Sequence, residues 1–216
     1  MENTIVKLPK SDFLISLEKI INGRFVSKAS PKRVDFFTHD MAVSTEANQE
    51  AALRLSTEPC EILRKLPEGP LNLYKDAIVL ITNDLNFPVK FYCAWSSVLF
   101  GGNSAIQTQQ IWADPKIRHL RIDGLPLGAF CLFKVLIPRY KIVIGADEHT
   151  PDGERHAKNQ VKYAINKGIS VYAIDEFNKL YNITTQEFIE KNENLLWGVD
   201  PKHKKRLLIY SEDSLF

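Results

Sequence analysis

In the middle of the chain, hydrophobic residues recur at every second position in some segments and at every third or fourth position in others. This change of period predicts strands that alternate with helices. The predicted order is a strand at 117–123, a loop at 124–128, an apolar helix at 129–138, a strand at 141–145, a helix at 151–167 and a strand at 169–174. This alternation is typical of an α/β sheet. Because ligands of such sheets bind where strands end, function should be sought at those ends.

The helix predicted at 151–167 has the clearest boundaries. Thr150 is a suitable N-cap, and Pro151 takes the first helical position, where a missing N–H costs nothing. Gly168 follows the last periodic residue, as is common at helix ends. The buried face should comprise Ala157, Val161, Ala164 and Ile165.

Upstream, two apolar runs at 77–82 and 89–97 flank a turn rich in Asn and Asp, which predicts a β-hairpin. Helical spacing at 11–23 and 45–55, and a short helix near 60–66, predict a helical N-terminal segment. Residues 105–113 could form another edge strand. We expect residues 1–75 to pack on an α/β core formed by residues 76–216, within one compact domain.

Composition and charge narrow the possible functions. The chain has 216 residues, is 44% hydrophobic and carries a formal net charge of +2, which gives no indication of nucleic-acid binding. No apolar run approaches the ~20 residues of a membrane span, and the N-terminus lacks the apolar region of a secretory signal, so we expect a cytoplasmic protein. The three cysteines lack metal-ligand spacing, and no metal site is expected.

Ionisable residues follow the predicted strands. Asp123, Asp147 and His149 all stand at such strand ends and are candidate catalytic groups. Each has a structural alternative: Asp123 precedes Gly124 and could form a turn, whereas Asp147 and His149 could stabilise the start of the next helix.

The order hairpin, strand, loop, helix, strand, helix, strand resembles the core of the GNAT acyltransferase superfamily. In that family the loop after the fourth strand presents backbone N–H groups to the pyrophosphate of acyl-CoA. The resemblance implies a mixed sheet, antiparallel at first and parallel in the centre, flanked by helices. It also implies that the donor is held by Ile122, Gly124, Leu125, Gly128 and Ala129. The family's leading Arg or Gln is missing here, and Pro126 removes one N–H donor.

Three stretches are similar to one GNAT-like branch, the RTX toxin-activating lysine acyltransferases. They are residues 79–84 (VLITND), the returning strand with Pro88, Tyr92 and Trp95, and the segment 122–128 with Asp123. The likeness covers about 77–128. It implies transfer of an acyl group from acyl-ACP or acyl-CoA, used as a co-substrate with no tightly bound cofactor, to an amine of a protein acceptor.

The same resemblance assigns catalytic roles. His39 would remove the proton from the amine or carry the acyl group transiently, Asp123 would orient the imidazole, and N–H groups around Gly124 would stabilise the oxyanion. His39 lies farther upstream than the family pattern has it, so Asp147 with His149 forms a reserve pair. This hypothesis requires the strand ending at Ile122 and the strand at 141–145 to be parallel neighbours that part beyond Ile122.

Partners and alternatives remain open at this point. Basic residues could dock an acidic acyl carrier protein, although a solvated strand edge explains them as well; they are Arg118, His119, Arg121, Arg139 and Lys141. A homodimer is possible. A second hypothesis is a non-catalytic GNAT-like accessory protein of phage or mobile-element type that binds a host protein. A third is an unrelated α/β hydrolase using Asp147 and His149, although no Gly-x-Ser-x-Gly nucleophile motif is present.

Overall fold

A computed structural model describes residues 4–9, 61–84, 89–145, 151–175, 177–192 and 207–215. Contacts divide the chain into two compact units. Unit one comprises residues 1–9, 95–109 and 120–216, and unit two comprises residues 10–94 and 110–119. Two long strands, β5 (Val89–Phe100) and β6 (Asn103–Ala113), contribute residues to both units.

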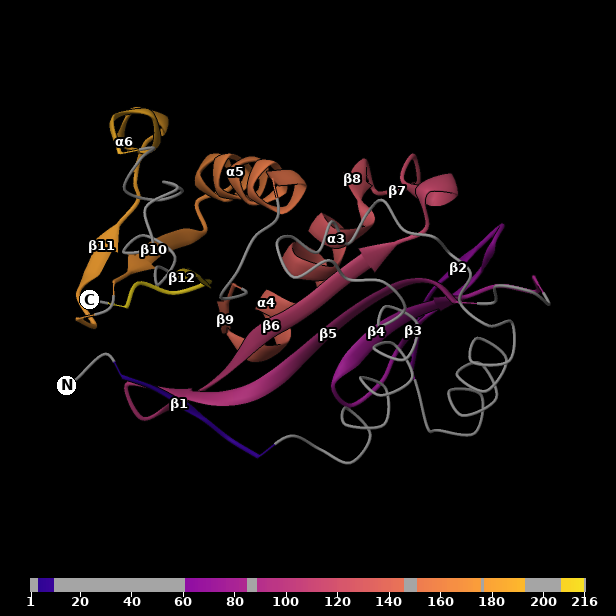
Figure 1. Cartoon of the computed structure of the whole chain (residues 1–216), viewed down its shortest axis with the longest axis horizontal. Coiled ribbons are helices and arrows are strands. Elements are labelled where there is room, and N and C mark those ends of the chain that lie inside the picture. The colour runs from indigo at the N-terminus through magenta and orange to yellow at the C-terminus, as the bar shows by residue number, and fades with distance from the viewer. Residues whose placement is uncertain are drawn as a thin grey trace, which may run out of the picture. The chain divides into compact units, whose positions relative to one another are not determined.

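Unit one is built on a mixed sheet with the order β11-β10-β12-β9-β6-β5 (Figure 1). Its further strands are β1 (Ile5–Lys7), β9 (Ile142–Ile144), β10 (Ser170–Ile174), β11 (Leu180–Asn182) and β12 (Leu207–Ser211). β6 pairs with β9 in parallel, whereas β9/β12, β12/β10, β10/β11 and β1/β5 pair antiparallel.

A helical connection joins the parallel pair. It consists of α3 (Leu127–Phe130), a π-helical segment (Cys131–Leu136) and α4 (Ile137–Tyr140), and we call residues 127–140 the crossover helix. α5 (Pro151–Asn166) links β9 to β10, and α6 (Gln186–Lys191) follows β11. Parallel strands need such crossovers because a tight turn can join only antiparallel neighbours.

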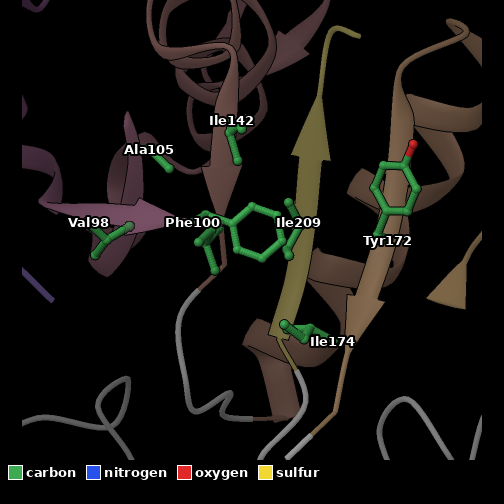
Figure 2. Packing of buried hydrophobic residues seen from close by; sticks show 8 residues of the cluster. Val98, Phe100, Ala105, Ile142, Tyr172, Ile174 and Ile209 are labelled. Atoms are coloured by element: carbon green, nitrogen blue, oxygen red, sulfur yellow. The ribbon is translucent and has the colours of Figure 1, made fainter. Parts of the chain in front are cut away.

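Apolar residues cover both faces of this sheet. On one face, Phe133 of the crossover helix packs edge-on against Tyr210 of β12, with ring centroids 6.1 Å apart. On the other face, Figure 2 shows the ring of Phe100 reaching toward Ile209. The buried cluster on that face comprises Val98, Phe100, Ala105, Ile142, Ile144, Tyr172, Ile174 and Ile209.

Unit two contains an antiparallel meander. β2 (Glu61–Leu66), β3 (Gly69–Leu73), β4 (Ala77–Ile81) and the first part of β5 follow one another in space as in sequence. Lys90 is an extra residue in β5, since Leu80 pairs with Phe91 and Ile81 pairs with Val89. This β-bulge directs the Lys90 ammonium to Asp84 at 2.7 Å and Asp114 at 3.4 Å.

The predicted α/β class is confirmed, but the sheet is mostly antiparallel and helices are sparse. The hairpin of β4 and β5 and the helices at 127–140 and 151–166 are present where the pattern predicted them. These observations support the α/β class but do not identify the GNAT-like fold within it, so the GNAT-like assignment remains a proposal. Among the described residues, no helix has the length and apolar character needed to cross a membrane.

Three predicted elements are wrong. Residues 117–123 form no strand of the main sheet: Pro115–Ile117 is a 3₁₀ turn, and β7 (Arg121–Ile122) pairs only with β8 (Leu125–Pro126) in a separate two-stranded sheet. The expected edge strand is instead β6, which lies between β5 and β9. The short helix expected near residue 60 is strand β2. Buried and exposed residues do not alternate regularly along β2, but it pairs with β3 along its length.

Other predictions concern residues outside the described ranges. They are the helices at 11–23 and 45–55 and the positions of His39, Asp147 and His149. The same holds for the N-cap Thr150.

Candidate functional site

The candidate site lies where β6 and β9 stop pairing. Their parallel register comprises Ile106 with Val143 and Gln107 with Ile144, after which β9 ends. β6 continues beyond Gln107 without a β9 residue opposite it. In open α/β sheets, ligands bind at the carboxyl ends of parallel strands, and here the parallel pairing stops at the carboxyl end of β9.

Side chains replace backbone pairing at this point. Thr108 Oγ1 donates to the carbonyl oxygen of Ile144 at 3.3 Å, and Gln107 Nε2 donates to that of Gly145 at 3.5 Å. Because neighbouring strand residues face opposite sides of a sheet, these two side chains reach β9 from its two faces. The end of β9 is therefore held to β6 by one polar contact on each face.

Gly145 turns the chain toward β12. Its N–H donates to the carbonyl oxygen of Leu208 at 2.7 Å, so the backbone after Ile144 bonds to the neighbour on the far side from β6. A side chain at this position would come within 3.4 Å of that carbonyl oxygen. This is an ordinary van der Waals distance, so packing against β12 does not by itself require a glycine at this position.

Buried polar residues extend the site along β5 and β6. Ser96 is 5% exposed, and its Oγ accepts a hydrogen bond from Gln109 Nε2 at 3.0 Å. Gln107 is 1% exposed and Thr108 is 8% exposed. Such residues are rarely buried in strands unless they bond to neighbours, so the polar run Gln107–Gln109 marks a specialised part of the sheet.

Sequence reasoning missed this group of residues. The signal was present, since four consecutive polar residues, 107–110, separate the apolar pairs Ala105–Ile106 and Ile111–Trp112 of the strand. We predicted another edge strand at residues 105–113, whereas the structure shows a central strand between β5 and β9.

Asp123 occupies the tip of the β7–β8 hairpin. Ile122 pairs with Leu125, which leaves Asp123 and Gly124 as the two turn residues, with φ of 52° and 78°. Positive φ at both central residues defines a type I′ turn, for which Asp-Gly is a preferred pair. The Asp123 side chain is exposed, and its described surroundings fit a turn role.

The other predicted donor-binding residues lie close by in sequence. Ile122, Leu125 and Ala129 are buried, and so is Gly128 in the first turn of α3. Pro126 is the N-cap residue of that helix and has no side-chain acceptor for the first N–H groups. In a β-α-β unit the helix begins at the edge where the strands end, so we expect this turn to lie toward the carboxyl end of β9.

The three other predicted catalytic residues, His39, Asp147 and His149, lie outside the described residues, so their distance to Asp123 is not defined. Among the described residues of unit one, the histidine is His156 of α5. Its Nε2 lies 3.0 Å from Nε2 of the buried Gln160.

Thiol and metal chemistry find no support among the described residues. Burial raises the pKa of the Cys93 thiol to about 12, which keeps it protonated and unreactive at neutral pH. Cys131 is also buried and free. In the described part of the chain, no three His, Cys, Asp or Glu side chains are grouped to hold a metal ion.

Comparison of this chain with protein-family models, with curated proteins and with solved structures found no match.

Proposed function

We propose that the protein is an acyltransferase that moves an acyl group from a thioester carrier, acyl-ACP or acyl-CoA, to an amine, with a protein lysine as acceptor. One observation carries the proposal. The hypothesis required the strand ending at Ile122 to lie beside the strand at 141–145, and that requirement is wrong, since β7 pairs only with β8. β6 takes that place: the parallel strands β6 and β9 are joined by a crossover helix, and their pairing ends after two residue pairs. In the strand order β6-β9-β12-β10, this parallel pair is followed by two antiparallel pairings.

The chemistry suits such an edge. The acceptor amine attacks the thioester carbonyl carbon, so that a C–N bond forms, the C–S bond breaks and the thiol leaves with a proton. As donors for the oxyanion that forms, we propose main-chain N–H groups in the first turn of α3, which no side chain caps. A base that removes the amine proton would contribute roughly 10²–10⁴-fold to the rate.

For that base we propose His39, with Asp147 and His149 as the reserve pair. Asp123 remains the proposed partner of the imidazole. Its exposed position at a hairpin tip allows contact with an approaching residue, but the turn alone also explains why Asp is present. A carboxamide tests this point, because Asn tolerates positive φ as well as Asp does.

A second candidate function has its own observation. Leu125, Leu127 and Phe130 are 8%, 5% and 6% exposed, so apolar side chains fill the segment in which acyltransferases bind their donor. A non-catalytic protein that retained the fold and bound a host protein would show this feature as well.

The deciding experiment uses the purified full chain with acyl-ACP and acyl-CoA of several chain lengths and a protein lysate as acceptor. We expect thiol release and acylated lysines, detected by mass spectrometry. Thr108→Ser should retain activity, whereas Thr108→Val, which loses the contact to the end of β9, should reduce it. His39→Ala and Asp123→Asn test the two roles. Absence of acyl transfer with every donor would favour the binding function.

A further inference from the structure

Strand β1 lies at a margin of the sheet of unit one, where it pairs with β5 (Figure 1). The N–H of Leu8 donates to the carbonyl oxygen of Ser97 at 3.2 Å, and the N–H of Gly101 donates to that of Thr4 at 3.2 Å. Main-chain groups alternate in direction along an antiparallel strand, so every second residue from 4 to 8 directs these groups at β5. Among the described residues, no other strand pairs with β1.

The main-chain groups of Ile5 and Lys7 therefore point away from β5, toward the outer margin of the sheet. A strand that directs N–H and C=O groups outward from a sheet edge is a template for one more strand. Pairing at this margin would extend the sheet of unit one by that strand.

The side chains of β1 are apolar on both faces. Ile5 packs against the buried cluster that contains Phe100 and Ile209. Val6 and Leu8 face the other side of the sheet, because neighbouring side chains of a strand alternate, and they are 49% and 37% exposed. In the described part of the chain five large hydrophobic side chains are exposed, and two of them are adjacent on this face. Such an apolar edge strand favours pairing with another chain.

An antiparallel second copy of β1 matches this margin when Val6 lies opposite Val6 of the second copy. Ile5 then lies opposite Lys7 of the second copy, and the two pairs of this kind form four main-chain hydrogen bonds. Thr4 lies opposite Leu8 of the second copy, so the apolar side chains of both copies form one patch on the exposed face. The Val6 pair is of the non-hydrogen-bonded kind, in which side chains approach most closely.

Other symmetric registers fit less well. A two-fold axis at Lys7 would place two lysines directly opposite each other, and like charges in that position are destabilising. An axis at Ile5 would carry Leu8 beyond Thr4 of the second copy and leave Leu8 uncovered by the described strand. The residues of β1 thus select the axis at Val6, and this selection favours a second copy over an unrelated peptide.

We propose that β1 pairs with β1 of a second copy of this chain, so that the two sheets of unit one continue across a two-fold axis at Val6. A two-fold contact of this kind is closed, because both copies use the same surface. A pair of such short strands buries less than the roughly 1,200–2,000 Å² of a standard interface, so the dimer should be weak, with a dissociation constant of about 1–100 μM. This dimer is independent of the enzymatic activity proposed above.

Cysteine cross-linking tests the register. The Cα atoms of a non-hydrogen-bonded pair lie about 4.5 Å apart, within the range of a disulfide. Val6→Cys should therefore give a disulfide-linked dimer of the full chain after mild oxidation. Leu8→Cys is the matched control, because the two Leu8 positions would be about 14 Å apart along the strands, beyond the reach of a disulfide. Each result is compared with the unchanged chain, which has three cysteines.

Sedimentation velocity between about 1 and 200 μM measures the dimer without any cross-link, and we expect the unchanged chain to shift from monomer to dimer over this range. Val6→Glu should bind its copy at least roughly tenfold more weakly, because two carboxylates would meet at the axis. The control, Ile62→Glu, makes the same charge change at a 53% exposed residue of strand β2 and should dimerise within about twofold of the unchanged chain. Circular dichroism verifies that both variants are folded.

Three outcomes would overturn the proposal. The first is a chain that stays monomeric at every concentration and gives no Val6→Cys cross-link, which would leave the margin to a strand of another protein. The second is a dimer that Ile62→Glu dissociates and Val6→Glu does not, since it would form elsewhere on the molecule. The third is equal cross-linking of Val6→Cys and Leu8→Cys, which the register does not allow.

Discussion

At the scale of single residues, two tyrosines of unit one have hydroxyl groups in contrasting environments. Tyr210 is buried, and in the described part of the chain its hydroxyl has no hydrogen-bond partner. Tyr181 donates to Asp175 Oδ2 at 2.9 Å, and Asp175 Oδ1 accepts from two backbone N–H groups of the same loop. The Tyr210 hydroxyl therefore adds a desolvation cost that no hydrogen bond offsets, whereas the Tyr181 hydroxyl completes a hydrogen-bond network.

Replacing each tyrosine by Phe should separate these cases. Tyr210→Phe should leave the free energy of unfolding unchanged or raise it by up to ~1 kcal/mol, because an unsatisfied buried group is removed. Tyr181→Phe should lower it by about 1–2 kcal/mol, because a bond to a carboxylate is lost. Urea denaturation measures both, and an equal loss in the two variants would contradict the assignment.

Lys90 is a buried cation in unit two. It is 8% exposed and lies between Asp84 and the 4% exposed Asp114. Lys90→Met should destabilise the protein by roughly 3–5 kcal/mol, because it leaves a buried carboxylate without its cation. Adding Asp114→Asn should restore part of this loss, and a double-mutant cycle measures the coupling. Strictly additive effects would show that the ion pair contributes nothing.

At the scale of elements, glycine positions distinguish a close approach from a turn. Gly69 has φ of 149°, and a Cβ there would lie 2.0 Å from the carbonyl oxygen of Ile81. Gly102 has φ of 82°, but a Cβ there would meet nothing within 4 Å. The first glycine lets β3 pass close to the end of β4, and the second only permits the turn between β5 and β6.

Alanine substitutions at these two glycines should therefore differ. Gly102→Ala should cost about 1 kcal/mol, the penalty of a left-handed backbone. Gly69→Ala should cost at least ~2 kcal/mol, because the backbone of β4 must also move. Thermal unfolding of both variants checks the difference. A Gly69→Ala variant as stable as Gly102→Ala would mean that β3 and β4 are less close than described.

Three elements show which sequence signals were sufficient to predict the structure that a segment forms. Pro151 and Gly168 located α5 to within a residue because both residues act through local backbone geometry. Asp123 and Gly124 carried an equally local signal for a type I′ turn, and we overestimated the strand before them. The central position of β6 could not be predicted from its own residues, because its polar side chains at 107–109 bond to partners on β5 and β9 that are distant in sequence.

At the scale of the whole molecule, buried ionisable groups predict how stability depends on pH. Burial raises the pKa of Cys93 from 9.0 to about 12 and also raises that of Tyr210 above its usual 10.0. The unfolded chain then loses protons at lower pH than the folded chain. Their contribution to stability is complete below about pH 9 and is lost as the pH rises through the folded-state values.

We therefore expect the free energy of unfolding to fall above pH 9, with Cys93 contributing up to about 1.4 kcal/mol per pH unit. Cys93→Ala should remove this part of the slope, and Tyr210→Phe should remove the part that begins near pH 10. Denaturation series between pH 7 and 11 measure both slopes. Parallel curves for the unchanged chain and Cys93→Ala would contradict the burial of that thiol.

The central claim is that an acyl thioester lies at the edge where β6 and β9 stop pairing. The most direct measurement is photo-crosslinking of the full chain with an acyl thioester that carries a diazirine in its acyl chain, followed by peptide mapping. The account predicts labels on Gln107–Gln109 and Gly145, reduced by unlabelled donor and by Thr108→Val. Labels that unlabelled donor does not reduce, or labels confined to residues away from this edge, would contradict it.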